Sequence, residues 1–478
     1  FTMDKFLTQL KVSGESEIKR VLNTDAHAVV ITKEVNNGMI NIGGRIDVQV
    51  VYVSVDDEIE TMAGSVDFIE KQPTSYVLDD IYVEDKTTVI NVNFSGKDAI
   101  CSVEHQAKVS GTYSYELGGG YDDESLVLNK KNFSCLKLAK TGEDNFVVAE
   151  EVESNMTGVT VLEADAKAMA VEVSASVDKI VIEGNILANL TVKDADGTYF
   201  KQRNFEFKQE VNATGVTPNM TAKADVQVAK ITVTPEAKND KTNFVFAIDL
   251  NAKAIAYEET NYDIVTDMFS LKNLITTTTD YVEMKSYAET KVVTENVVSA
   301  TNVADIEKFD DIVGIFNPYY ECLGIENEET KAQVNGNIKA TALYLADGQI
   351  FKLDIVCPVQ TTISKQPNEV ASKVDGLVEI GTNKVKAGKE LEVNFKLDIR
   401  VELEVAVSEK FIKGYENAGE RVANAGGVTV YIAGEGDTLF DIAKAICVRP
   451  ETISKQNDEN TVFEKDDKIY VYSPINLI

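Results

Sequence analysis

Apolar and polar positions alternate along three stretches of closely similar sequence. Each stretch opens with glycine, carries isoleucine two positions later, and then alternates apolar and polar residues. The stretches occupy residues 44–52, 184–192 and 336–344. Period-two alternation is typical of a β-strand with one buried face and one wet face. We therefore predict three equivalent strands, with the buried sets Ile46, Val48 and Val50; Ile186, Ala188 and Leu190; and Ile338, Ala340 and Ala342.

An acidic turn and a second strand follow each of these stretches. The turns lie at residues 56–57, 194–197 and 347–348, and the second strands at 59–68, 199–207 and 351–356. Asp-Gly between two alternating runs is a strong hairpin signal. The opening glycines lie 140 and 152 residues apart (184 − 44 and 336 − 184). Solenoid repeats have a much shorter period of about 20–50 residues. The pattern predicts three tandem copies of one β-rich domain.

Composition shifts divide the chain further. The predicted parts are residues 1–118, 119–279 and 280–412 for the three β-domains, 413–427 for a flexible linker rich in Gly, Ala and charge, and 428–478 for a small C-terminal domain. Residues 3–20 read as a lead-in of one or two helical turns, and 148–154 and 264–274 are compatible with helices. Periodicity does not choose between sandwiches and open sheets flanked by helices.

The clearest single strand runs from Leu391 to Val407, where apolar and polar residues alternate without a break. Strands in globular proteins are usually about 3–10 residues long. We therefore expect this strand to bend, to bulge, or to span two sheets of a sandwich.

The charge balance limits the classes of partner. The chain has 478 residues and a formal net charge of −31, from 47 basic and 78 acidic side chains. Nucleic-acid binding requires a basic face, and so does docking on an anionic membrane surface. No window approaches the roughly 18 apolar residues of a membrane span. The N-terminus also lacks a basic region followed by an apolar run. We expect no nucleic-acid partner, no membrane insertion and no secretory leader.

Cysteine and histidine are sparse. The cysteines are Cys101, Cys135, Cys322, Cys357 and Cys447, and none forms a CxxC pair. Single thiols favour inert buried side chains in a reducing compartment, with cross-linking between molecules as the alternative. His27 and His105 are the histidines, and His105 lies in an alternating run typical of a structural position on a sheet. We predict no metal site.

No catalytic motif is present. The chain has no GxSxG elbow, no HExxH helix and no Walker loop. Acidic clusters at 122–124, 310–311 and 326–329 are more typical of solvated loops than of paired glycosidase carboxylates. We predict that the protein is not an enzyme and has no cofactor.

The C-terminal fifty residues carry the most specific pattern. A strand at 429–433 precedes a helix from Leu439 to Ala445, which Asp437 or Thr438 is placed to cap. Pro450 opens a second helix, and residues 468–472 form a closing strand. The order β-α-α-β, with Gly-Asp-Thr-Leu in the first turn and Asn after the second helix, resembles a LysM domain.

The LysM resemblance implies a groove for chains containing N-acetylglucosamine, between the loop before the first helix and the loop after the second. Carried over to this sequence, the rim of the groove would comprise Gly436, Asp437, Thr438, Leu439, Phe440, Asn457, Asp458 and Glu459. The same residues would serve as a docking groove if the ligand were a protein.

Tandem strands that open Gly-Asn-Ile or Gly-Arg-Ile, placed ahead of a LysM-like domain, resemble the SPOCS-domain proteins of spore-forming clostridia. The resemblance implies a mainly β fold of three SPOCS-like domains followed by a βααβ LysM domain. It also implies a sporulation protein that joins a coat scaffold ATPase, or other coat proteins, to further coat layers. The expected location is the mother-cell cytoplasm, at the surface of the forespore.

Two alternative functions stay open. One is an anchoring protein that binds peptidoglycan through N-acetylglucosamine oligomers. The other is a self-associating structural subunit of the spore outer layer, in which the strand from Leu391 to Val407 pairs between molecules.

Overall fold

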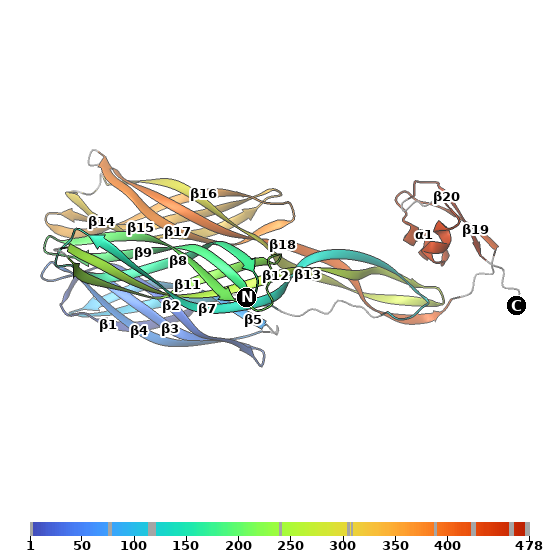
Figure 1. The fold of residues 1–478 in the computed structure, drawn as a ribbon, viewed down its shortest axis with the longest axis horizontal. Helices are drawn as coiled ribbons and strands as arrows, with labels where there is room; N and C mark the ends of the chain where they lie inside the picture. Colours follow the sequence, from blue (N-terminus) through green and yellow to red (C-terminus); the bar gives the residue numbers. More distant parts are fainter. Residues whose placement is uncertain are drawn as a thin grey trace. The chain divides into compact units, whose positions relative to one another are not determined.

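The computed structural model describes residues 3–74, 79–112, 121–238, 241–303, 306, 309–386, 390–421, 427–457 and 463–473. Within these residues the chain forms β-strands along most of its length and two short helices near the C-terminus (Figure 1). The fold is therefore mainly β, as the alternating patterns predict.

The first eighteen strands fall into three groups of six. The first group is β1 (Phe6–Ser13), β2 (Ile18–Asn36), β3 (Met39–Ser54), β4 (Ile59–Pro73), β5 (Asp79–Ser95) and β6 (Asp98–Thr112). The second is β7 (Leu126–Ser154), β8 (Thr160–Ser176), β9 (Lys179–Lys193), β10 (Thr198–Asn212), β11 (Thr221–Lys238) and β12 (Lys241–Ser270). The third is β13 (Asn273–Asn302), β14 (Asp311–Asn327), β15 (Lys331–Ala346), β16 (Gln349–Ser364), β17 (Glu369–Lys386) and β18 (Glu390–Glu420).

Each group has the same topology. Its second, third and fourth strands form one three-stranded sheet in chain order, and its first, sixth and fifth strands form another. The sheets of the second group, for example, are β8-β9-β10 and β7-β12-β11. The three predicted hairpins are the antiparallel pairs β3–β4, β9–β10 and β15–β16. Since a shared topology accompanies the shared sequence motif, the groups are referred to below as the first, second and third copy.

The two sheets of each copy pack face to face. In the second copy Ile182 and Ile186 of β9 share one apolar core with Phe246 and Ile248 of β12. The nine predicted inward residues on β3, β9 and β15 are all buried. The structure thus resolves the alternative between sandwiches and open sheets in favour of sandwiches.

The glycine that opens each motif makes room for an aromatic ring. The three pairs are Gly44 with Phe68, Gly184 with Phe207, and Gly336 with Tyr320. Gly184 lies directly opposite Phe207 in the β9–β10 register. A Cβ at Gly184 would lie 2.6 Å from Cζ of Phe207 and 2.3 Å from the carbonyl oxygen of Met169. Any other residue would therefore displace both the ring and the neighbouring strand.

The chain divides into two compact units. Unit 1 comprises Phe1–Ser114, Leu138–Glu258 and Tyr287–Glu404, and unit 2 comprises Tyr115–Lys137, Glu259–Ser286 and Val405–Ile478. Four strands, β7, β12, β13 and β18, run from one unit into the other. The predicted strand from Leu391 to Val407 is the first part of β18, which continues to Glu420.

Several local predictions were wrong. The stretch 148–154 belongs to β7, and 264–274 lies in the end of β12 and the start of β13, so neither is helical. The predicted helical lead-in is β1, which pairs with β6, followed by the start of β2. Lys413–Glu420 in the predicted linker continues β18, and residues 422–426 lie outside the described residues. In each case pairing with a strand distant in sequence overrides the local pattern.

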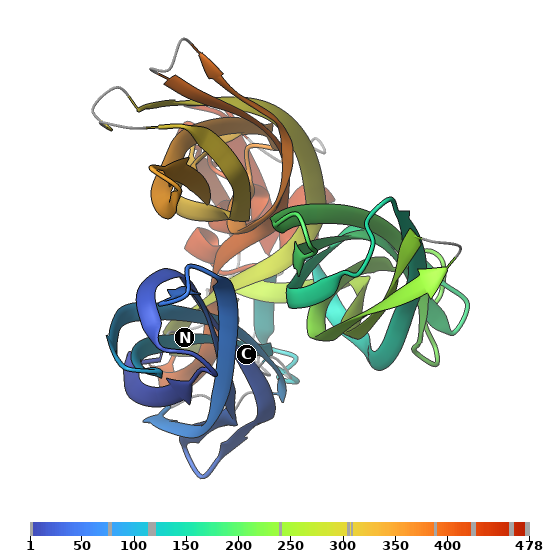
Figure 2. The same ribbon diagram turned by 90° about the vertical axis from the view of Figure 1, so that its left-hand side faces the viewer.

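The three sandwiches of unit 1 are arranged around a common centre, drawn in blue, green and orange in Figure 2. At this centre an apolar cluster joins all three copies, and we call it the central junction. Its residues are Leu22, Val51, Val53, Ile59, Leu162, Phe200, Val313, Phe316, Leu343 and Ile350. The Phe200 and Phe316 rings stack with their centroids 4.9 Å apart.

Equivalent bulges deliver one side chain from each copy to the central junction. The strand register shifts between Val21 and Asn23 on β2, between Val161 and Glu163 on β8, and between Ile312 and Gly314 on β14. The residues skipped by these shifts are Leu22, Leu162 and Val313. A bulge turns one side chain out of the normal alternation. The same irregularity, repeated three times, therefore builds the contact between the copies.

Candidate functional site

The C-terminal module, residues 427–473, belongs to unit 2. Its elements are β19 (Gly427–Ile432), α1 (Leu439–Ile446), α2 (Pro450–Ser454) and β20 (Lys468–Ser473), and β19 pairs with β20 in antiparallel fashion. Ile442, Ala443 and Ile453 of the helices pack against Ile469 and Val471 of β20. The observed order is strand, helix, helix, strand.

Hydrogen bonds fix the loop before α1. Thr438 caps the helix, because its Oγ1 accepts a hydrogen bond from the backbone N–H of Asp441 at 3.2 Å. Asp441 Oδ2 in turn accepts from the Thr438 N–H at 2.9 Å. The bonds from Thr438 lower the pKa of the Asp441 carboxyl. Asp437 accepts from the Gly434 N–H at 2.7 Å and from the Tyr431 hydroxyl at 3.1 Å. The sequence pattern therefore located this cap correctly.

Asn457 is bound to the backbone of its own module. Its Nδ2 donates to the carbonyl oxygens of Ile453 at 3.0 Å and Tyr470 at 2.8 Å, and its Oδ1 accepts from the Tyr470 N–H at 3.0 Å. Gln456 makes the same pair of bonds to Tyr472, at 3.2 and 2.7 Å. The two amide side chains thus occupy the hydrogen-bonding edge of β20 in place of a third strand.

The other predicted groove residues lie in different surroundings. Gly436 has a φ of +84°, which favours glycine. Leu439 and Phe440 contribute to the apolar core of unit 2, where Phe440 is buried. Asp458 and Glu459 lie outside the described residues. Of the described rim residues, the structure brings Gly436, Asp437 and Thr438 together in one loop.

Helix α1 contacts the ends of β7 and β12 within unit 2. The rings of Phe440 and Phe269 meet edge to face with centroids 5.5 Å apart. Lys444 Nζ lies 2.6 Å from Asp267 Oδ2, and Arg449 Nη2 donates to the carbonyl oxygen of Glu124 at 2.5 Å. Sequence reasoning missed this contact, because nothing local marks a pairing across 177 residues.

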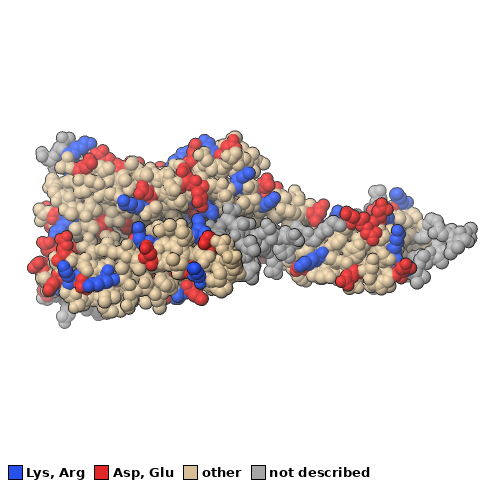
Figure 3. All heavy atoms as spheres, turned by 90° about the horizontal axis from the view of Figure 1, so that it is seen from below, with Lys and Arg blue, Asp and Glu red and all other residues tan. Residues whose placement is uncertain are grey.

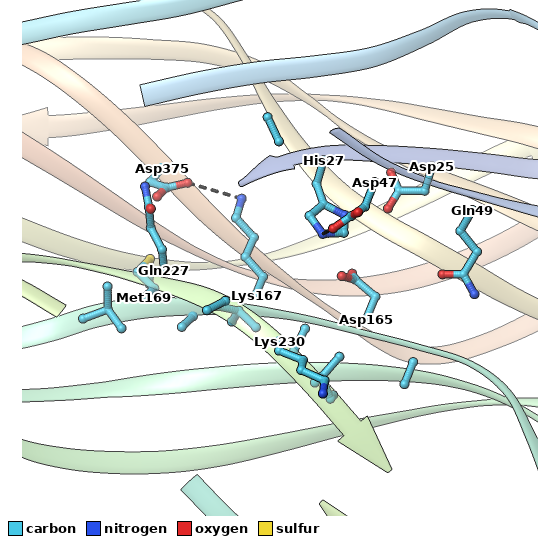
Figure 4. A pocket seen from close by; sticks show the side chains of 18 of the residues that line it. Asp25, His27, Asp47, Gln49, Asp165, Lys167, Met169, Gln227, Lys230 and Asp375 are labelled. Carbon is cyan, nitrogen blue, oxygen red and sulfur yellow. Dashed lines mark ion pairs between the residues drawn. The ribbon is translucent and has the colours of Figure 1, made fainter. Parts of the chain in front are cut away.

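A cavity of about 950 Å³ lies within unit 1. Its lining includes Asp25 and His27 of the first copy, Asp165 and Lys167 of the second, and Asp375 of the third (Figure 4). Lys167 Nζ lies 3.3 Å from Asp375 Oδ1, the pair joined by the dashed line. The lining also includes Arg45 and Lys230, so it carries charges of both signs.

Carboxylates from two copies gather beside this cavity. Glu163 is only 7 % exposed, and burial raises its pKa to about 7. The charges of Asp25 and Asp165 act in the same direction, against a hydrogen bond of 3.2 Å from Thr191 Oγ1. Burial, followed by the charge of Asp165, also raises the pKa of Asp25. Among the described residues, no group of three or more His, Cys, Asp or Glu side chains is arranged to hold a metal ion.

A set of charges with a buried centre connects the second and third copies, and we call it the ionic seam. Its members are Lys223 and Asp225 of β11, Lys373 of β17, and Arg400 and Glu402 of β18. The seam centres on Arg400, whose Nη1 lies 3.2 Å from Asp225 Oδ1 and whose Nη2 lies 3.0 Å from Glu402 Oε1. Burial alone would raise the pKa of Asp225, but Lys373 and Arg400 lower it overall.

The histidine predicted to be structural is enclosed in the first copy. His105 on β6 is fully buried, with Nδ1 2.7 Å from Glu70 Oε1 and its ring against Phe68. Cys101, Cys135 and Cys357 are buried, as predicted, and Cys447 is half-buried. The prediction was wrong for Cys322, which is exposed on β14.

Basic and acidic side chains are interspersed on the face of the molecule that Figure 3 shows. The described part of that face carries no continuous basic stripe of the kind that follows a nucleic-acid backbone. Among the described residues, no helix has the length and apolar character needed to cross a bilayer.

Comparison with known families gives one match. Residues 159–236 match the family described as SipL, SPOCS domain. The matched segment spans β8, β9 and β10 and most of β11 of the second copy. Neither the curated proteins nor the solved structures give a match to the chain. The chain is therefore a SPOCS-domain protein that resembles SipL, and the match indicates a spore-associated, sporulation-related coat protein.

Proposed function

We propose that this chain is a non-enzymatic assembly protein of the spore coat, which joins a surface scaffold to further coat layers. The observation that carries the proposal is the SPOCS match on β8–β11, within a chain that repeats the same six-strand topology three times. Three copies held by a shared apolar centre form one compact body, which presents several surfaces at fixed spacing. Such a body suits bridging between layers better than it suits turnover of a substrate.

The C-terminal module is the proposed recognition end, as a LysM-type domain. Support comes from the strand-helix-helix-strand order and from the Gly436–Leu439 turn, with Thr438 as helix cap. The proposed partner is the scaffold ATPase of the spore coat, or another coat protein, met at the forespore surface from the mother-cell cytoplasm.

A protein partner fits the module better than a glycan. The amide of Asn457 already makes three hydrogen bonds to backbone groups, so it has no spare donor for an acetamide carbonyl. Phe440, the aromatic residue of the predicted rim, packs against Phe269. A sugar ring in this groove would therefore find neither the Asn457 amide nor the Phe440 ring free to contact it.

The test measures binding of the purified scaffold ATPase to three proteins: the full chain, a chain ending at residue 427, and a full chain with Thr438→Ala and Asp441→Ala. The truncation is expected to lower affinity at least tenfold. The double substitution removes both halves of the cap on α1 and is expected to weaken binding less. Lys193→Ala in unit 1 removes only a surface ion pair with Glu58, so it is the matched control.

Equal binding by the truncated chain would contradict the role of the module and would assign recognition to the β-rich copies. Titration of the full chain with N-acetylglucosamine oligomers covers the other class of ligand. Saturable binding that is lost on truncation, without binding to the ATPase, would replace the proposal with peptidoglycan anchoring.

A further inference from the structure

The two-stranded sheet of the C-terminal module exposes an apolar face. On β19, the side chains of Val428, Val430 and Ile432 are 58, 50 and 60 % exposed. Tyr470 and Tyr472 of β20 are 42 and 57 % exposed. The register places Val428 opposite Tyr472, Val430 opposite Tyr470, and Ile432 opposite Lys468. We call these six residues the outer face.

On β19 the apolar side chains face solvent, which is the reverse of the usual order in a sheet with one solvent-exposed face. Thr429 and Tyr431 take the alternate positions, which are the more covered ones, while the branched aliphatic residues face solvent. In β20 the alternation is normal, with Ile469 and Val471 buried against the helices. An apolar outer face of this kind is characteristic of a surface that another molecule covers.

The edge of β20 is not available for strand addition. Gln456 and Asn457 already bond to the backbone N–H and C=O groups of Tyr470 and Tyr472. With the β20 edge closed, the apolar surface that this sheet offers a partner is the outer face, on which a second sheet can pack as in a sandwich.

We propose that the outer face binds the same face of a second copy of this chain, around a two-fold axis that crosses the strands at Val430 and Tyr470. The charges fit this arrangement. The only charged residue of the face is Lys468, which lies at one end. The two-fold rotation reverses the strand direction of the second copy, so Lys468 faces the ring of the partner's Tyr472. A lysine above a tyrosine ring is a favourable cation–π contact. Val430 then meets its own equivalent on the axis.

The area is sufficient for a weak dimer. Five side chains that are about half exposed bury on the order of 1,000 Å² when two such faces meet, at the low end of specific interfaces. We expect half of the chains to be dimeric at a protein concentration of roughly 10–100 μM. Because each chain carries a net charge of −31, added salt should strengthen the dimer by screening the repulsion between the remaining surfaces. The proposal does not depend on the function proposed above.

The first experiment measures the mass of the full chain by sedimentation equilibrium between about 1 and 200 μM, at low and high salt. Val430→Glu is expected to weaken dimerisation at least tenfold. Ile31→Glu is the matched control, since Ile31 is a branched aliphatic residue, 69 % exposed, on β2 of unit 1. A wild-type chain that stays monomeric throughout overturns the proposal and leaves the face to a different protein. A dimer unaffected by Val430→Glu also overturns it.

The second experiment tests the axis and needs no destabilising charge. In a chain with Cys322→Ser, which removes the exposed thiol, Val430→Cys places a thiol on the axis, and Ile432→Cys places one off it. Oxidation is expected to yield a disulfide-linked dimer at least ten times faster for Val430→Cys. Equal rates, or faster coupling of Ile432→Cys, would rule out this two-fold arrangement.

Discussion

The three copies meet through two contacts of opposite chemistry. The central junction is apolar, with Leu343 and Val51 almost completely buried and the Phe200 and Phe316 rings stacked. The ionic seam between the second and third copies consists of charges around the buried side chain of Arg400, some of which are half-buried. The first contact is stabilised by removing surface from water, whereas the second depends on complete pairing.

The contrast indicates different roles. An apolar cluster tolerates small changes in the angle between two copies, because dispersion and burial have little directionality. The seam requires specific geometry, since Arg400 must reach Asp225 and Glu402 and donate from Nη2 to the carbonyl oxygen of Ala224 at 2.9 Å. We infer that the junction holds the copies together and that the seam fixes the orientation of the third copy against the second.

Arg400→Met should cause the largest loss of stability. It keeps most of the side-chain volume but leaves Asp225 and Glu402 with fewer partners in a buried site, which costs about 3–5 kcal/mol. Urea unfolding at pH 7.5 measures the loss. The control is Lys193→Met, whose ion pair with Glu58 lies at the surface and is expected to matter by less than about 0.5 kcal/mol. Similar losses in both variants would show that the seam acts as an ordinary surface ion pair.

Leu343→Ala should cause the second-largest loss of stability. Leu343 is fully buried in the central junction, and a cavity left by truncating a buried leucine costs about 2–4 kcal/mol. Leu323 is an equivalent control on β14, since it is 63 % exposed and its truncation should change stability by less than about 0.5 kcal/mol. A loss below 1 kcal/mol for Leu343→Ala would mean that the copies are held together elsewhere.

Glu163→Gln should have an effect on stability that depends on pH and almost vanishes in acid. Burial raises the folded-state pKa of Glu163 from 4.5 to about 7, so this group binds more protons in the folded than in the unfolded chain between those values. Its contribution to stability is therefore full below about pH 4.5 and is lost as the pH rises to about 7. One pKa unit corresponds to about 1.4 kcal/mol, so the substitution should stabilise the protein by up to about 3 kcal/mol at pH 8 and leave it nearly unchanged near pH 4.5.

The measurement is urea unfolding of both proteins at several pH values. Glu58→Gln, at an exposed position, provides the control. If Glu163→Gln shifted stability equally at pH 4.5 and pH 8, the effect would come from packing rather than from ionisation of Glu163.

The sequence predicted the strands and hairpins correctly where every second side chain is buried. Ile186, Ala188 and Leu190 alternate strictly, and β9 contains them as predicted. The segment 148–154 lacks such alternation, and only its place in β7, where Val148 and Val152 pack on the core of the second copy, makes it a strand. The cap at Thr438 was recoverable because it depends on a side chain three residues from its partner.

The sequence by itself determined the local features of this protein: the alternating strands, the acidic hairpin turns, the capped helix and the threefold recurrence of a glycine motif. Each strand, turn, cap and copy of the motif is specified by residues a few positions apart. Only the tertiary structure decided that Leu22, Leu162 and Val313 meet, that Arg400 joins Asp225 across 175 residues, and that Asn457 binds the backbone of β20. These contacts depend on bulges and strand register, which shift a side chain from one face of a sheet to the other without changing composition or periodicity.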